Sequence, residues 1–148
     1  ITVYCASSAR READGTIGLC MKFVNGGYTL NDQSSIIWHE AYHVRNDEPC
    51  SMEEHEVPSG ITYSDVPSDI EDYIKNDLYG QRLSDKEYKD EITVSRTKSP
   101  GYYRNEIATY QAEINNGINV SSSYTQERNY LYWKHQQDLK IAEQYYNK

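Results

Sequence analysis

The sequence has few of the residues that usually build a hydrophobic core. It holds one phenylalanine and two tryptophans against 15 tyrosines, and its hydrophobic fraction is only 37%. Much of the core must therefore come from rings that carry hydroxyl groups, and each buried hydroxyl needs a hydrogen-bond partner. We expect a core of modest strength, to which a bound metal or a disulfide would add stability.

Basic residues are also scarce. Lys and Arg number 15 against 23 Asp and Glu, which gives a net charge of −8. This balance argues against a nucleic-acid partner, because binding a phosphate backbone relies on clustered cations. The sequence has no apolar run near the roughly 20 residues that cross a bilayer, which argues against a membrane helix. The chain has 148 residues and no sharp change in composition, which predicts a single domain, 1–148. The sequence does not determine its oligomeric state.

The three cysteines limit the disulfide chemistry. Cys5, Cys20 and Cys50 allow one disulfide, and no two of them have the C-x-x-C spacing of many metal sites. Cys5 and Cys20 lie in two stretches that we predict to be strands, so we expect them to pair. Three reduced thiols in a cytoplasmic protein are the alternative. Because the chain starts at Ile1 rather than Met, we expect a mature protein that is secreted or extracytoplasmic.

Strand signals come early in the sequence and helix signals come late, which predicts an α+β fold. Runs of β-branched and aromatic residues at 1–8 and 15–24 predict a small N-terminal sheet. A helix capped by Asp32, Ser34 or Ser35 should follow and end near Pro49, before a polar loop. Helices marked by a cap, a proline or a terminal glycine are predicted at 68–80, 84–96 and 99–117. The helical spacing of Tyr124, Leu131, Leu139 and Ala142 predicts a last helix at about 122–146.

The motif H-E-x-x-H occupies residues 39–43 in the first predicted helix. Residues four apart stack on one helix face, so His39 and His43 can direct their imidazoles at one metal ion, with Glu40 beside it. Neighbouring Ile36, Ile37 and Val44 predict an apolar, buried face, where such a cluster would be costly without a ligand. The alternative is a polar face with exposed histidines and a solvated glutamate.

A catalytic zinc ion generally has three protein ligands and one open position, so a third ligand is needed. The longer metzincin pattern H-E-x-x-H-x-x-G-x-x-H is excluded by Asn46 and Pro49, which stand where it requires glycine and histidine. Downstream, the segment RNEIATYQAE carries Glu106 among small and apolar residues. Through HEAYH and NEIATY, with strands before the first motif, the sequence resembles the gluzincin metallopeptidases from about Thr16 to Glu113.

The resemblance implies a zincin-like fold, in which a small N-terminal sheet packs on the active-site helix and a helical half follows. The zinc ligands that it implies are His39, His43 and Glu106. Glu113 on the same later helix is a second candidate for the third position, and Glu40 becomes the general base. The implied activity is hydrolysis of a peptide or protein substrate by zinc-activated water. In this family the substrate lies along a sheet edge, which we expect the run at 16–24 to supply.

Other side chains could take part in catalysis by donating to the developing oxyanion. The candidates are Tyr102, Tyr103, Tyr110, His55 and His135. Asp32 and Asp47 could each orient an imidazole or serve as a cap or turn residue. Two other functions stay open. One is a zinc-binding interaction domain without catalysis, and the other is a metal-free helical module that binds partners through the tyrosines of YLYW and QYY.

Overall fold

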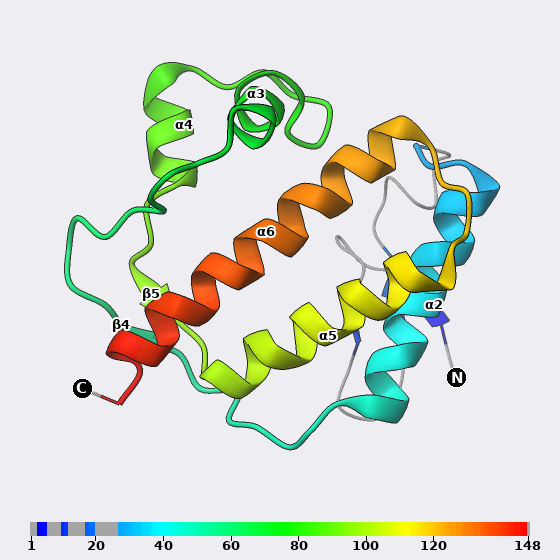
Figure 1. Ribbon diagram of the computed structural model, residues 1–148, viewed down its shortest axis with the longest axis horizontal. Coiled ribbons are helices and arrows are strands. Elements are labelled where there is room, and N and C mark those ends of the chain that lie inside the picture. Colours follow the sequence, from blue (N-terminus) through cyan, green and yellow to red (C-terminus); the bar gives the residue numbers. More distant parts are fainter. Residues whose placement is uncertain (1–2, 6–9, 12–16, 20–26, 148) are drawn as a thin grey trace. The chain divides into compact units, whose positions relative to one another are not determined.

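The structure is a computed structural model that describes residues 3–5, 10–11, 17–19 and 27–147. Over these ranges it is mostly helical, with two small sheets (Figure 1). The helices are α2 (Leu30–Asn46), α3 (Ser68–Asp77), α4 (Asp85–Glu91), α5 (Pro100–Asn116) and α6 (Ser122–Tyr145). The strands are β1 (Val3–Cys5), β2 (Arg10–Arg11), β3 (Ile17–Leu19), β4 (His55–Glu56) and β5 (Arg96–Thr97). This combination of helices and small sheets agrees with the predicted α+β class. None of the described helices is both long and apolar enough to pass through a lipid bilayer.

Contacts along the chain divide it into two compact units. Unit 1 comprises Ile1–Glu48 and Asn105–Thr125, and unit 2 comprises Pro49–Arg104 and Gln126–Lys148. Helices α5 and α6 therefore each contribute residues to both units. All residues of the predicted metal site fall in unit 1. The single-domain organisation stays a prediction.

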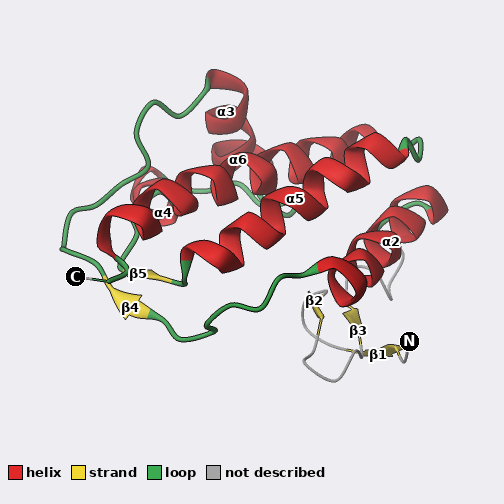
Figure 2. Cartoon of the chain, turned by 60° about the horizontal axis from the view of Figure 1, so that its bottom comes forward, coloured by secondary structure: helices red, strands yellow, loops and turns green. Residues whose placement is uncertain are grey.

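The sheet of unit 1 has the strand order β1-β3-β2. Strand β3 pairs in parallel with β1 and antiparallel with β2, so Gly18 has a partner strand on each side. This position contradicts the expectation that the run at 16–24 offers a sheet edge, because its described part, Ile17–Leu19, is the central strand. The outer strands are β1 and β2. Helix α2 contacts both β2 and β3, as a sheet packed on this helix requires (Figure 2). Cys20, in the expected disulfide, lies outside the described residues.

Helix α2 starts with a capping box. The Thr29 hydroxyl accepts from the Asp32 N–H, and the Asp32 carboxylate accepts from the Thr29 N–H, each at 3.1 Å. Both bonds satisfy N–H groups that a helix start leaves unpaired. The prediction that Asp32, Ser34 or Ser35 is the N-cap is therefore wrong, since all three lie within the helix. The helix ends before Pro49, as predicted.

The buried face of α2 is mainly polar. Its buried residues, spaced as one helical stripe, are Asp32, Ser35, Ile36, His39, Glu40 and His43. Ile37 and Val44 are 38% and 40% exposed, so the predicted apolar face is correct only for Ile36. The alternative with exposed histidines and a solvated glutamate is wrong. Because buried polar groups need compensation, the contacts of this stripe decide what the helix does.

The core of unit 2 is rich in tyrosine, as the composition predicted. Its buried cluster consists of Ile70, Tyr73, Ile74, Leu78 and Tyr130. The Tyr130 hydroxyl donates to Glu91 at 2.6 Å, which satisfies the polar end of a ring that is 1% exposed. Leu131 and Trp133 pack against the same cluster. Three residues of the YLYW segment therefore contribute to packing in this core.

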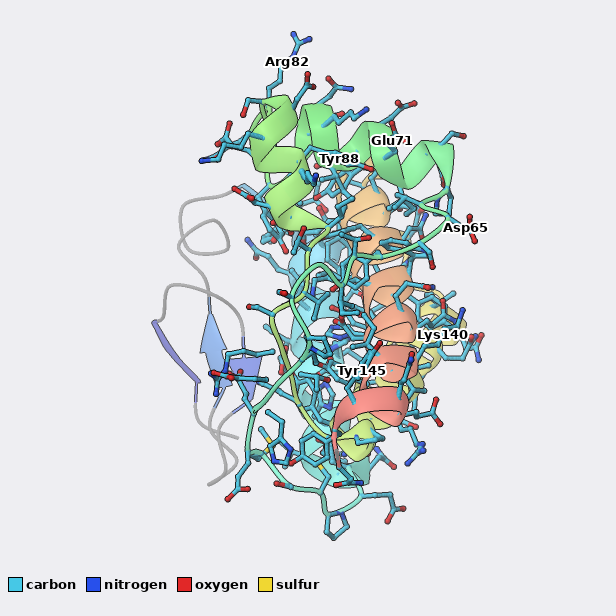
Figure 3. All side chains as sticks on the ribbon, turned by 90° about the vertical axis from the view of Figure 1, so that its left-hand side faces the viewer. Asp65, Glu71, Arg82, Tyr88, Lys140 and Tyr145 are labelled. Atoms are coloured by element: carbon cyan, nitrogen blue, oxygen red, sulfur yellow. The ribbon has the colours of Figure 1, made fainter. Side chains whose placement is uncertain are left out.

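Helices α3 and α4 contact each other in unit 2. Glu71 of α3 and Tyr88 of α4 lie close together (Figure 3). Lys75 joins them, because its Nζ lies 2.6 Å from the Glu71 carboxylate and 4.8 Å from the centre of the Tyr88 ring. The predicted cap Ser84 is confirmed by a capping box, whereas α3 has Pro67 rather than Ser68 at its N-cap.

A second sheet in unit 2 was not predicted. Strand β4 lies in the segment expected to be a polar loop, and β5 lies in the segment expected to continue the helix after Glu91. The two strands pair antiparallel, with His55 opposite Thr97. Each strand has only two residues, so neither shows the alternation that identifies a strand in a sequence. Both strands lie in the part of the chain where the sequence predicted helices and loops, so the predicted order of elements is incomplete.

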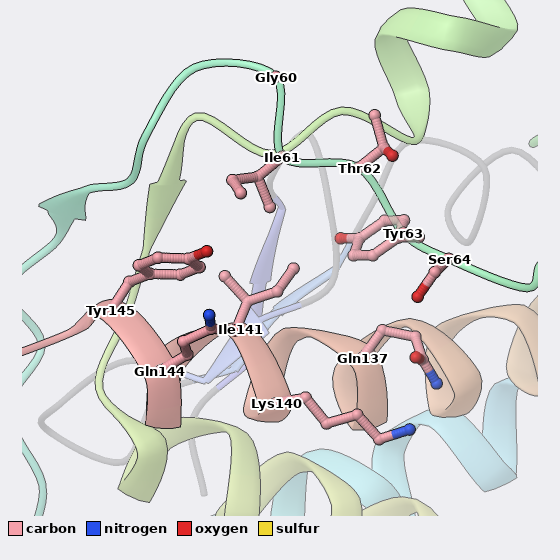
Figure 4. A pocket seen from close by; sticks show the side chains of 10 residues that line it. All are labelled: Gly60, Ile61, Thr62, Tyr63, Ser64, Gln137, Lys140, Ile141, Gln144 and Tyr145. Atoms are coloured by element: carbon pink, nitrogen blue, oxygen red, sulfur yellow. The ribbon is translucent and has the colours of Figure 1, made fainter.

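Unit 2 also contains a pocket of about 370 Å³ between the segment 60–64 and α6 (Figure 4). Helix α6 lines it with Gln137, Lys140, Ile141, Gln144 and Tyr145. The neighbouring segment is held by backbone hydrogen bonds, since the Tyr63 N–H donates to Ile92 and the Val94 N–H donates to Ile61. This pocket has no part in the predicted metal site.

Candidate metal centre

Three side chains of unit 1 converge on one point. His39 and His43 come from α2, and Glu106 comes from α5. The two Nε2 atoms lie 3.2 Å apart. The carboxylate of Glu106 reaches to 3.2 Å from His43 Nε2 and to 3.7 Å from His39 Nε2. One ligand atom from each residue lies within 4.8 Å of the others, so this group could hold a metal ion.

The spacing of these atoms fits zinc. Nitrogen and oxygen ligands lie about 2.0–2.2 Å from zinc, so two ligands of a tetrahedral site lie about 3.3 Å apart. The two Nε2 atoms are 3.2 Å apart, Glu106 Oε1 is 3.2 Å from His43 Nε2 and Glu106 Oε2 is 3.7 Å from His39 Nε2, all close to that value. Two imidazoles and one carboxylate also form a donor set that zinc prefers in catalytic sites. The residues present therefore fit a zinc ion.

Glu113 contacts the other nitrogen of His39. Its Oε1 lies 2.8 Å from His39 Nδ1, while Oε2 accepts from Ser35 Oγ at 2.6 Å and from Tyr124 Oη at 2.7 Å. Because an ionised carboxylate only accepts, Nδ1 carries the hydrogen. In a neutral imidazole the lone pair is then on Nε2, the atom that faces Glu106. Glu106 thus lies at the two Nε2 atoms, whereas Glu113 lies at Nδ1 of His39.

His43 is oriented in a similar way. Its Nδ1 lies 2.7 Å from the Asp47 carboxylate, and the Thr109 hydroxyl lies 3.3 Å from the same nitrogen. The Thr109 hydroxyl donates to the Asn105 carbonyl at 2.8 Å, so its oxygen accepts from the imidazole. Asp47 is also the C-cap of α2, and thus has both of the roles considered for it. In the neutral imidazole, the lone pair of His43 therefore also lies on Nε2.

The electrostatic environment of the cluster favours positive charge. Burial lowers the pKa of His39, but hydrogen bonds to Glu106 and Glu113 and the charges of Glu106 and Glu40 raise that pKa to about 10. Burial also lowers the pKa of His43, and Glu106 outweighs it, so that this pKa is raised. The pKa of Glu113 is lowered despite burial, mainly through its hydrogen bond to His39. These carboxylates would attract a metal cation for the same reason that they hold protons on the imidazoles.

Glu40 and Tyr110 lie beside the cluster. Glu40, the residue after His39 in α2, is 8% exposed, and its negative charge raises the pKa of His39. The Tyr110 ring lies 4.4 Å from the His39 ring, centre to centre. Burial raises the pKa of Tyr110 well above its ordinary value, so its hydroxyl keeps its hydrogen at neutral pH. Among the side chains predicted to donate to an oxyanion, Tyr110 is the one that unit 1 contains.

The other predicted donors belong to unit 2. They are Tyr102, Tyr103, His55 and His135. The Tyr103 ring lies 6.0 Å from the ring of His135, and the Tyr102 ring lies 5.2 Å from that of Tyr103. His55 stacks on Tyr146. These four residues therefore have packing contacts within their own unit.

Sequence reasoning missed the residues that orient the imidazoles. Ser35 was considered only as a cap, Tyr124 and Thr109 were given no role, and Glu113 was considered only as a ligand. Helical spacing offered a signal, because Ser35 precedes His39 by one turn and Glu113 follows Glu106 by two turns. Residues so spaced share a helix face with a predicted ligand.

Comparison of the chain with protein-family models, with curated proteins and with solved structures finds no match. The resemblance to gluzincins stays a prediction that rests on the two motifs. The function has to be argued from the chemistry of the site.

Proposed function

We propose that this protein is a zinc-dependent peptidase of the gluzincin type with a zincin-like fold. His39, His43 and Glu106 are the zinc ligands, and Glu40 is the general base. One observation carries the proposal. Both Nδ1 atoms already contact carboxylates, so the two Nε2 atoms and the Glu106 carboxylate face one another at 3.2 to 3.7 Å. A metal cation bound among these atoms would take the place of the protons that the carboxylates favour on the imidazoles.

The remaining steps follow from the positions of the side chains. Bound to these three residues, zinc would supply a Lewis acid that polarises the substrate carbonyl and acidifies water. Glu40 accepts a proton from the attacking water and later delivers it to the departing amine. Tyr110, protonated beside His39, is the candidate donor to the oxyanion. Peptide hydrolysis of this kind needs no covalent intermediate with the protein.

An extended peptide is the substrate class that suits the sheet of unit 1. Strand β2 replaces the run at 16–24 as the candidate docking edge, because it is an outer strand and contacts α2. A peptide pairing there would be held by backbone hydrogen bonds, which leaves its side chains to set specificity. We retain the prediction of a peptide or protein substrate on this basis.

A zinc centre that only stabilises the fold is the second candidate function. Burial supports it, since the side chains of His39 and His43 are 7% and 4% exposed and that of Glu106 is 16% exposed. A second pocket, on the surface of α2, is lined by Ile37, Trp38 and their neighbours rather than by the three ligands. In this case, zinc would bind and no peptide would be cleaved.

Substitution Glu40→Gln separates the two candidates. It keeps the shape of the side chain and removes its basicity, so zinc content and melting temperature should stay close to those of the parent. Hydrolysis of a mixed peptide library near neutral pH should fall about a hundredfold or more, the usual effect of losing a positioned base. The control is Glu53→Gln, which removes an equal charge from a side chain that is 84% exposed in unit 2.

The outcomes are distinct. Peptide cleavage that zinc chelation and Glu40→Gln both abolish, and that the control retains, would support the peptidase. Stoichiometric zinc without cleavage by the parent would favour the stabilising centre. Cleavage that Glu40→Gln leaves unchanged would contradict the assigned base.

A further inference from the structure

We infer that Glu113 is a positioning residue for the metal centre, whose buried carboxylate holds His39 in the orientation and tautomer that direct Nε2 at the metal. The inference rests on the metal site of the proposed function, and it assigns Glu113 a role separate from that of the ligand Glu106. It is independent of whether the bound metal catalyses hydrolysis.

The contacts of Glu113 carry the inference. Three side-chain donors reach its two oxygens, and they come from two other segments of unit 1. Ser35 and His39 lie one turn apart on α2, and Tyr124 lies at the start of α6. The side chain of Glu113 is 0% exposed. With both oxygens engaged and no exposure to solvent, the carboxylate has little freedom to turn away from the imidazole.

The position of Tyr124 is itself fixed. Its N–H donates to the Ser121 hydroxyl, and Asp32 of α2 accepts from both the N–H and the hydroxyl of Ser121 at 2.7 Å each. The Tyr28 ring packs edge-on against the Tyr124 ring at 5.9 Å. Asp32 thus connects the start of α6 to the first turn of α2. Tyr124, one of the donors to Glu113, is consequently held in place by hydrogen bonds of its backbone as well as by packing of its ring.

His43 has a different kind of support. Its carboxylate partner, Asp47, lies one turn along the same chain segment and is 14% exposed. Glu113 comes instead from a helix that is 74 positions away from His39 in the sequence. A local partner at a helix end can be replaced by water more readily than a buried one. His39 therefore depends on Glu113 more than His43 depends on Asp47.

Substitution Glu113→Gln tests the tautomer directly, because it preserves size and replaces one acceptor oxygen with a donor NH₂ group. If that NH₂ group faces His39, Nδ1 must accept and the hydrogen moves to Nε2, which can no longer bind metal. If it faces Ser35 and Tyr124, two hydroxyls lose their acceptor. Either arrangement opposes the metal-binding orientation.

The experiment measures zinc affinity of the whole chain by competition with a chelating dye, together with the visible absorption of bound cobalt(II). For Glu113→Gln we expect zinc affinity to fall about 10- to 100-fold, the usual effect of losing a partner of a ligating histidine. The cobalt spectrum should change as His39 leaves or reorients. Asp47→Asn should have the smaller effect. Glu127→Gln is the matched control, since Glu127 is also buried but belongs to unit 2.

Three results would overturn the inference. The first is unchanged zinc affinity and cobalt spectrum in Glu113→Gln, and the second is an equal loss in Glu127→Gln. The third applies if Glu113→Gln does not fold, and it uses Tyr124→Phe and Ser35→Ala, each of which removes one donor to Glu113. Unchanged zinc affinity in both variants would overturn the role of Glu113. A severalfold loss in both would support it.

The inference and the proposed function fail in different ways. A parent protein that binds zinc but cleaves no peptide contradicts the peptidase and leaves the role of Glu113 standing. A Glu113→Gln protein that binds zinc like the parent contradicts only the role of Glu113. A parent that binds no zinc overturns both.

Discussion

The raised pKa of His39 predicts an unusual pH dependence for the metal-free protein. Glu106 and Glu113 outweigh the effect of burial and raise this pKa from 6.5 to about 10 in the folded state. A group with a raised folded-state pKa stabilises the fold fully below its unfolded value, and this contribution is lost as the pH rises through the folded value. Metal-free protein should therefore lose stability between about pH 6.5 and about pH 10.

The size of the effect follows from the shift. A change from 6.5 to about 10 corresponds to about 5 kcal/mol, an interaction that His39 shares with its carboxylate partners. Because His39 is only 6% exposed, solvent screening reduces it little. Small domains have total stabilities of about 5–15 kcal/mol, so the loss would be a large part of the whole. Bound zinc would take the place of the proton and should reduce the loss.

Two measurements check this prediction. The ring proton signals of the four histidines can be followed by NMR in chelator-treated protein, where His39 should titrate near pH 10. Urea unfolding at rising pH gives the stability directly, with and without zinc. His39→Gln is the control, since it removes the titrating group while the 15 tyrosines and the lysines remain.

The reasoning would be refuted by a His39 signal that titrates at or below pH 6.5. It would also be refuted if metal-free parent and His39→Gln lost equal stability between about pH 6.5 and about pH 10.

Two further predictions concern the ligands and the cysteines. Purified protein should hold about one zinc ion per chain, as elemental analysis would measure. His43→Ala and Glu106→Gln should each lower zinc affinity by more than Glu113→Gln does, because each removes a direct ligand. Dye competition measures these affinities, and a larger loss in Glu113→Gln would show that the third ligand is misassigned. Cys5 and Cys20 should be linked in natively secreted protein, as checked by non-reducing mass spectrometry, whereas three alkylatable thiols would favour the reduced alternative.

The sequence by itself determined the histidine pair. His39 and His43 lie one turn apart, so any helix over this segment brings their side chains to one face. The end of that helix was equally local, because Pro49 opposes helical geometry in the residue before it. Its start could also have been found, since Thr29 and Asp32 have the spacing of a capping box.

Tertiary structure decided the roles of the two later glutamates. Glu106 and Glu113 are seven residues apart on α5, which places them on similar faces of one helix, and the sequence offers no physical distinction between them. Their roles depend on how α5 passes α2, which brings Glu106 to the Nε2 atoms and Glu113 to Nδ1 of His39. That approach is set by packing between segments far apart in the chain.

The same limit applies to the sheets. Composition marked β3 as a strand, but its central place depends on pairing with β1 on one side and β2 on the other. Strand propensity describes a residue's own fit to a pleated surface, whereas strand order is a property of the partners. The polar face of α2 is the clearest case. A polar stripe of this kind normally faces water, and it is buried here because Glu113 of α5 pairs with Ser35 and His39, and Ser121 pairs with Asp32.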